Sequence, residues 1–126
     1  MEKLFIEATK YTPEVDFNPS TLILSIAGKS YPENTFEFYS PINEWIKEFL
    51  NSLTDEKVLL KLDLEYLNSS SLKAFFDLFD NLEAAVEKGI DTYVQWIYDK
   101  ENDISEETAE DFVEDFTKLN IELVVK

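Results

Sequence analysis

The chain has 126 residues, 44% hydrophobic and 14% aromatic, which suffices for one well-filled core and predicts a single domain over residues 1–126. Its 27 acidic and 11 basic residues give a formal net charge of -16, and every basic residue is a lysine. A field this negative repels nucleic acid and anionic membranes and favours partners with a basic patch, while the absence of arginine removes the bidentate phosphate clamp of phosphopeptide readers and nucleotide-binding enzymes.

Neither cysteine nor histidine occurs in the chain. Their absence excludes disulfides, thiolate zinc sites and cysteine nucleophiles, and it removes the commonest general base and transition-metal ligand. No segment approaches the roughly 18 apolar residues of a membrane span, and residues 1–10 lack the uninterrupted apolar stretch of a secretion signal. We therefore expect a cytoplasmic, non-enzymatic protein that needs no cofactor or metal.

The first part of the chain predicts strands. Alternating apolar residues suit a short strand at residues 4–8. Residues 15–17 and 22–27 flank the turn-forming residues 18–20 and predict an antiparallel hairpin, whose second strand is expected to end at Gly28 and Lys29.

From residue 34 the apolar period becomes helical. One stripe consists of Phe38, Ile42, Trp45, Ile46, Phe49, Leu50 and Leu53. Asn34 with Glu37 resembles a capping box, whereas Ser40 and Pro41 would also suit a helix start. We expect a helix that begins near Thr35 and bends at Pro41.

The rest of the chain alternates strands with helices. Strands are expected at residues 58–66, 93–98 and 121–125. One helix carries an apolar stripe over residues 72–86 and ends at Gly89, and another has Asp103 and Glu106 in positions suited to its cap. The fold class is therefore α/β, a mixed sheet with an N-terminal antiparallel hairpin, a parallel β-α-β-α-β part and about three helices.

A run of hydroxyl groups stands at one strand-to-helix junction, at Asn68-Ser69-Ser70-Ser71. Such junctions lie at the carboxyl end of the sheet, where the free N–H groups and positive dipole of the helix favour a phosphate. A kinase could modify a hydroxyl in that place. The alternative is that Asn68 or a serine only caps the helix, which these residue types do routinely.

This junction resembles the signature of the SiaC family of bacterial regulatory phosphoproteins, whose fold is similar to the STAS domains of anti-sigma-factor antagonists. The resemblance rests on Leu-Glu-Tyr-Leu-Asn-Ser-Ser-Ser-Leu-Lys-Ala at residues 64–74, on Asp77 and Phe79-Asp80, on Ser30-Tyr31-Pro32-Glu33-Asn34, on Thr12-Pro13 and on Trp96, Tyr98 and Asp99. It covers nearly the whole chain.

The resemblance implies a site and a set of partners. In members of this family the phosphorylated residue is a threonine in a Tyr-Leu-Asn-Thr-Ser-Ser pattern. Ser69 occupies the matching position here, and Ser70 is a rival acceptor. The unphosphorylated protein is expected to bind and activate a diguanylate cyclase. A serine/threonine kinase is expected to abolish that contact by phosphorylating the protein, and a metal-dependent serine phosphatase is expected to restore it. The expected partner contacts are Tyr31, Glu33, Asn34, Tyr66, Asn68, Ser70, Ser71 and Lys73. Asp63, Glu65 and Asp77 would sharpen the repulsion of a partner if they share the surface.

Two other classes of function compete with this interpretation. An acidic mimic of nucleic acid would bind basic proteins broadly and be indifferent to Ser69. A small hydrolase that uses carboxylates would need a concave site with perturbed acids. The segment from Asp99 to Glu110 spaces carboxylates like a calcium loop, but Ile104 stands where that loop needs glycine, so we expect no metal site.

Overall fold

The computed structural model describes residues 1–126 and contains six strands and three helices. In chain order these are β1 Leu4–Ile6, β2 Glu14–Asn18, β3 Ile23–Ser30, α1 Thr35–Asn51, β4 Lys57–Leu67, α2 Ser69–Glu87, β5 Asp91–Tyr98, α3 Asp103–Asp115 and β6 Asn120–Val125. No helix has the length and apolar character to cross a membrane.

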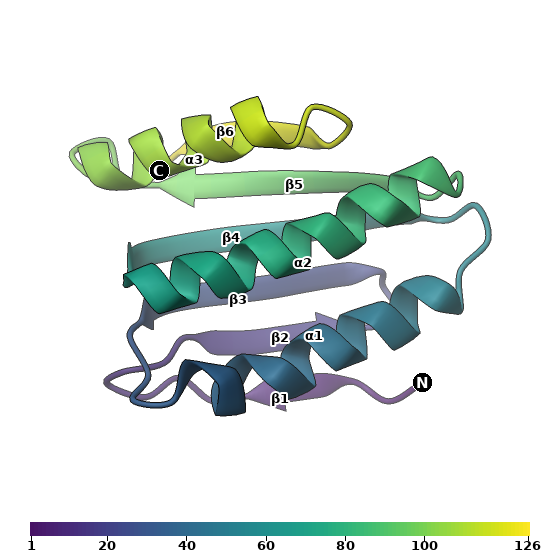
Figure 1. Ribbon diagram of the computed structural model, residues 1–126, viewed down its shortest axis with the longest axis horizontal. Coiled ribbons are helices and arrows are strands. Elements are labelled where there is room, and N and C mark those ends of the chain that lie inside the picture. Colours follow the sequence, from purple (N-terminus) through teal and green to yellow (C-terminus); the bar gives the residue numbers. More distant parts are fainter.

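The strands form one sheet in the order β1-β2-β3-β4-β5-β6. β1, β2 and β3 pair antiparallel, and β3 to β6 pair parallel, so the predicted mixed α/β fold is confirmed. Right-handed crossovers between successive neighbouring strands place every connecting helix on the same side. Figure 1 shows the three helices in one layer over one face of the sheet.

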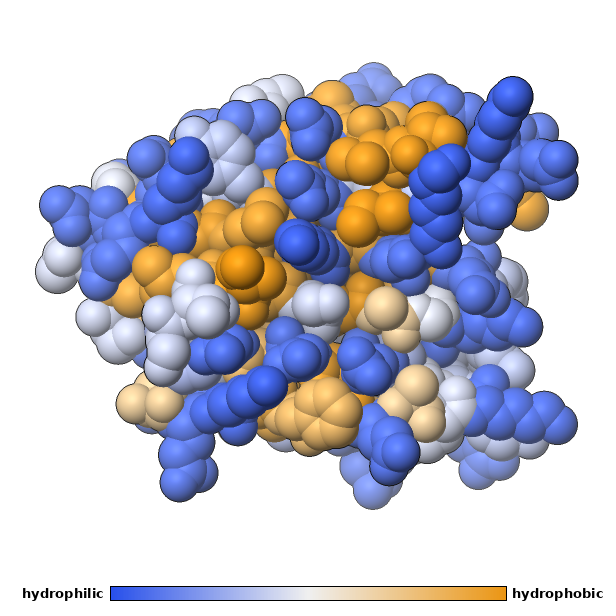
Figure 2. Space-filling model, turned by 180° about the vertical axis from the view of Figure 1, so that it is seen from behind, coloured by the Kyte–Doolittle hydropathy of each residue, from blue (hydrophilic) through white to orange (hydrophobic).

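The core lies between the helices and this covered face. Alternate strand residues such as Phe17, Ile26, Leu62 and Trp96 point to the helices and are almost completely buried. The other face has no helix over it, and Figure 2 shows it as apolar patches separated by hydrophilic side chains. We call it the open face.

α1 begins at Thr35, as the sequence predicts. The Asn34 side chain accepts a hydrogen bond of 3.0 Å from the backbone N–H of Glu37 and caps the helix, which then continues through Pro41. Its buried face also includes Tyr39, which lies outside the predicted apolar stripe. At the end of α2, Gly89 has φ +97° and follows the C-cap residue, as expected.

The predicted end of β3, at Gly28 and Lys29, was too early. The strand continues to Ser30, and its register against β4 shifts between Gly28 and Lys29. Gly28 adopts φ +125°, which a residue without Cβ reaches at little cost, so the glycine forms an irregularity inside the strand. This extension brings Ser30 beside the end of β4.

The cap predicted for α3 was also misplaced. Asn102 is the N-cap, because its side-chain oxygen accepts a hydrogen bond of 3.1 Å from the backbone N–H of Ser105. Asp103 and Glu106 lie in the first turn instead, where carboxylates interact favourably with the helix dipole.

Candidate functional site

The candidate site is the junction between β4 and α2. Asn68 is the N-cap of α2, and its side-chain oxygen accepts a hydrogen bond of 2.8 Å from the backbone N–H of Ser71. Its own backbone N–H donates to the carbonyl oxygen of Ser30 at 3.0 Å. These bonds fix the start of α2 against the end of β3.

The three serines at this helix start lie in three different environments. Ser69 is exposed, and its hydroxyl makes no hydrogen bond. Ser70 is exposed as well, but its Oγ lies 2.7 Å from Oγ1 of Thr35 and donates a longer bond to Asn68. Ser71 is completely buried. Of the three hydroxyls, the one on Ser69 is therefore both accessible and unengaged.

A buried hydroxyl network lies directly beneath the site. Ser71 Oγ lies 2.8 Å from Ser30 Oγ and donates to the Ser30 carbonyl at 3.1 Å, and Ser30 Oγ lies 2.5 Å from the hydroxyl of Tyr39. Burial raises the pKa of Tyr39 to about 12, and the hydrogen bonds to Ser30 and Ser71 offset only part of that effect. The phenol is therefore neutral at physiological pH, and the network joins β3, α1 and α2.

This network corrects one predicted contact. Ser71 was expected to touch a partner, yet its side chain has no exposed surface and is bonded to Ser30. Sequence reasoning also missed Ser30, Tyr39 and Thr35 as parts of the site. They come from other elements, and no local pattern connects them with the serine run.

The charge around Ser69 suits an added phosphate. The first turn of α2 contains no acidic residue, and Lys73 lies four positions along the same helix, on the face that Ser69 occupies. Asp63, Glu65 and Asp77, which would sharpen the repulsion of a partner if they shared the surface, do not all lie on one face. Asp63 pairs with Lys126 at 2.8 Å on the open face, Glu65 lies 4.0 Å from Lys29, and Asp77 lines the groove described below.

Three tyrosines form an aromatic cluster next to the junction. The ring of Tyr31 lies 5.3 Å from that of Tyr11 and 5.9 Å from that of Tyr66, both edge to face. Tyr66 is 51% exposed and Tyr11 is 47% exposed. Tyr31 and Tyr66 were predicted as contacts, and the structure brings them together with Tyr11, which was not predicted.

The remaining predicted residues lie on the same edge. Glu33 is exposed in the loop before α1, and Lys73 is exposed on α2. The Asn34 and Asn68 side chains cap α1 and α2, so each has a structural role whether or not it touches a partner.

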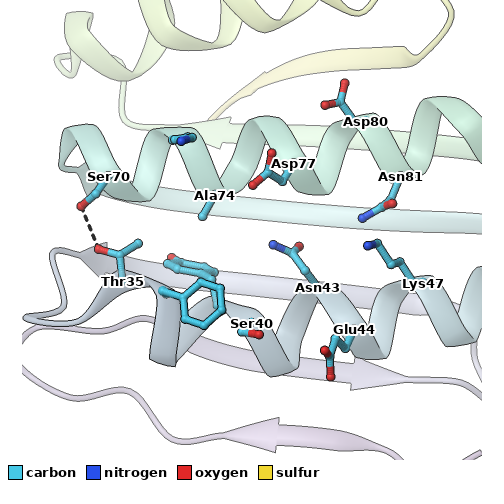
Figure 3. A pocket seen from close by; sticks show the side chains of 13 residues that line it. Thr35, Ser40, Asn43, Glu44, Lys47, Ser70, Ala74, Asp77, Asp80 and Asn81 are labelled. Carbon is cyan, nitrogen blue, oxygen red and sulfur yellow. Dashed lines mark hydrogen bonds between the residues drawn. The ribbon is translucent and has the colours of Figure 1, made fainter.

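A groove of about 680 Å³ runs between α1 and α2, starting at the hydrogen bond between Thr35 and Ser70 (Figure 3). Tyr39 and Ala74 line it, together with polar side chains from both helices. Phe36, which is 81% exposed, borders it near that end. No group of three or more acidic side chains anywhere in the chain is arranged to hold a metal ion.

The structure is a small α/β domain with three helices on one face of a mixed sheet, and it presents a free serine hydroxyl at the start of the second helix. Residues 6–126 match the SiaC family of regulatory phosphoproteins, and the chain belongs to this family. Among individual proteins, it is similar to SiaC of Pseudomonas aeruginosa, with 34% identity, a TM-score of 0.92 and complete coverage of both chains.

Two further comparisons agree with this assignment. The chain is 35% identical to a chain in the crystal structure of the diguanylate cyclase SiaD in complex with its activator SiaC from Pseudomonas aeruginosa, with a TM-score of 0.92 and coverage of 98% of this chain and 99% of the other. An uncharacterized protein of Pseudomonas aeruginosa strain UCBPP-PA14 is 39% identical over 117 residues, which are 91% of this chain and 90% of the relative.

Proposed function

We propose that the protein is a non-enzymatic, cytoplasmic regulator that binds and activates a diguanylate cyclase when unphosphorylated, and that phosphorylation of Ser69 weakens this binding. The observation that carries the proposal is the exposed, unbonded hydroxyl of Ser69 at the first position of α2. The similarity to SiaC, described as the activator of the diguanylate cyclase SiaD, supports the choice of partner.

Ser69 is a better acceptor than its rival Ser70. A kinase reaches its hydroxyl without breaking a hydrogen bond, whereas Ser70 would have to leave Thr35. A phosphate on Ser69 gains about 0.3 to 1 kcal/mol per charge from the helix dipole, and Lys73 lies within reach on the next turn. The fold therefore tolerates the product, and a serine/threonine kinase and a metal-dependent serine phosphatase would set the ratio of the two forms.

The phosphate acts on the surface around it. Phosphoserine adds about -1.5 to -2 charges at pH 7. Tyr66, three residues before Ser69, belongs to the aromatic cluster, and exposed tyrosines are the kind of residue that interfaces use as anchors. An uncompensated charge in such a contact costs several kcal/mol, and a loss of about 3 kcal/mol weakens binding over a hundredfold.

The test compares Ser69→Ala with Ser70→Ala, both as the full chain. Mass spectrometry after incubation with the kinase of the same organism is expected to find one phosphate on the wild type and on Ser70→Ala, and none on Ser69→Ala. Phosphate taken up by Ser69→Ala would assign the acceptor to Ser70.

A binding measurement with the diguanylate cyclase tests the consequence. Ser69→Ala is expected to bind like the wild type and Ser69→Asp about tenfold or more weakly, while the thermal midpoints stay within a few degrees, because the residue is exposed. An acidic nucleic-acid mimic would bind basic proteins in general, and both variants would behave alike. That result would overturn the proposal.

A further inference from the structure

The open face leaves four parallel strands without a cover. β3, β4, β5 and β6 pair parallel, and the helices lie over their other face only (Figure 1). Parallel strands in proteins are nearly always covered on both faces. The open face therefore lacks the second layer that strands of this kind normally have, and apolar side chains are visible on it (Figure 2).

A hollow of about 460 Å³ lies on the open face over β3, β4 and β5. Ile23, Leu59 and Tyr93 form its apolar part, in one row across the three strands. Leu22 lines the hollow as well and has φ +63°, the only non-glycine residue of the chain at positive φ. A bulky residue in this conformation is strained, and such strain is concentrated at functional sites.

An exposed aromatic side chain stands on the same face. Phe5 on β1 is 54% exposed. It lies in one row with Asp16 on β2, Ser25 on β3 and Lys61 on β4, two residues after Leu59, so it points to the same side of the sheet as the hollow. A face that carries both an exposed ring and a hollow can pair with a copy of itself.

The charge of the open face favours a second copy of the chain. Five of the eleven lysines have side chains on it: Lys3, Lys29, Lys57, Lys61 and Lys126. Six of the 27 acidic residues lie there too: Glu14, Asp16, Asp63, Glu65, Asp91 and Glu122. The face is nearly neutral in a chain of net charge -16, so two copies repel each other least when they approach through it.

We infer that two copies of the chain associate through their open faces, around a two-fold axis that runs along β3. This axis places β1 of one copy over β5 of the other, and β2 over β4. Phe5 then meets Tyr93 and the rest of the hollow, and Asp16 lies opposite Lys61, because Phe5, Asp16 and Lys61 share one row. This contact goes beyond the proposed function, since it uses the side of the sheet away from α2 and Ser69.

Sedimentation equilibrium of the full chain measures the association. The protein is studied over about 1 to 500 µM and at about 0.5 M salt, which screens the repulsion between two chains of net charge -16. We expect a dimer that Phe5→Ser weakens about tenfold or more. Phe36→Ser is the matched control, because Phe36 is also exposed but belongs to α1, and it should dimerise like the wild type. A chain that stays monomeric throughout, or equal weakening by both variants, would overturn the inference.

An exchange of charges tests the two-fold axis. Lys61→Asp places carboxylates of the two copies opposite each other and should weaken the dimer about tenfold. Asp16→Lys combined with Lys61→Asp keeps the net charge of the wild type and restores opposite charges across the axis, so this double variant should dimerise again. A double variant as weak as Lys61→Asp would overturn the inferred pairing.

The other possible occupant of the open face is a different protein. Binding of the diguanylate cyclase to Phe5→Ser separates the two cases. Normal cyclase binding by this variant, together with a weakened dimer, supports the contact between two copies. A monomeric wild type whose binding to the cyclase Phe5→Ser weakens would assign the open face to the cyclase and overturn the inference.

Discussion

At the residue scale, two of the three neighbouring serines have different roles, because one hydroxyl is accessible and another is part of the buried structure. Ser69 stands free in solvent, and Ser71 two positions later has no exposed surface and bonds to Ser30. The switch that we propose needs both properties close together, because the acceptor would have to be reached by a kinase while the helix start that presents it stays fixed.

Replacing Ser71 by alanine tests the structural hydroxyl. The variant loses the bonds from Ser71 to the Oγ and the carbonyl oxygen of Ser30, so we expect the free energy of unfolding to fall by about 1 to 3 kcal/mol. Urea denaturation measures it. Ser69→Ala is the matched control and should stay within about 0.5 kcal/mol of the wild type. Equal stability of the wild type and Ser71→Ala would show that the buried network does not hold α2 in place.

At the element scale, the irregularity in β3 decides where the site is built. The register shift after Gly28 pairs Lys29 with Tyr66 and Ser30 with Leu67, so both strands reach the carboxyl edge together. Gly28 also approaches Pro13, because a Cβ at this position would lie 3.4 Å from the Cα of Pro13.

Gly28→Ala is therefore expected to be costly. Its φ of +125° is strained for any residue with a Cβ, and the new methyl group meets Pro13, so we expect a loss of about 1 to 3 kcal/mol or more in thermal or urea unfolding. Gly89→Ala serves as the comparison, since it shares a positive φ but has nothing within 4 Å of the added Cβ. A Gly28→Ala protein as stable as Gly89→Ala would mean that the contact with Pro13 is easily relieved.

The same elements show what could be predicted from the sequence. The start of α1 follows from Asn34 and Glu37, and the accessible hydroxyl follows from the strand-to-helix junction, because both depend on neighbouring residues. The extension of β3 depends on pairing with β4, which overrides the local signal of a glycine. The bonds from Ser70 to Thr35 and from Ser71 to Ser30 span 35 and 41 residues, so only the folded chain brings them together.

At the scale of the whole molecule, charge is unevenly distributed. α3 carries seven carboxylates and no lysine. On the open face, Asp16, Asp63 and Glu65 are each close to a lysine, although exposed pairs of this kind contribute little to stability. The negative field therefore extends mainly from the helix layer, the same layer that contains Ser69 and the groove.

This distribution predicts how binding responds to salt. A net charge of -16 accelerates the encounter with a basic partner from a distance, and salt screens that attraction, so the association rate constant should fall about tenfold or more between low and high ionic strength. The dissociation rate constant should change much less, because packed contacts hold the complex once it has formed. Surface plasmon resonance with the diguanylate cyclase separates the two rates.

Glu110→Gln combined with Glu114→Gln on α3 should reduce the salt dependence of association and leave dissociation unchanged, whereas Ser69→Asp should act mainly on dissociation. A dissociation rate that rises as steeply with salt as association falls would mean that the contact itself is ionic, which is the behaviour of an acidic mimic and not of a surface switched at one serine.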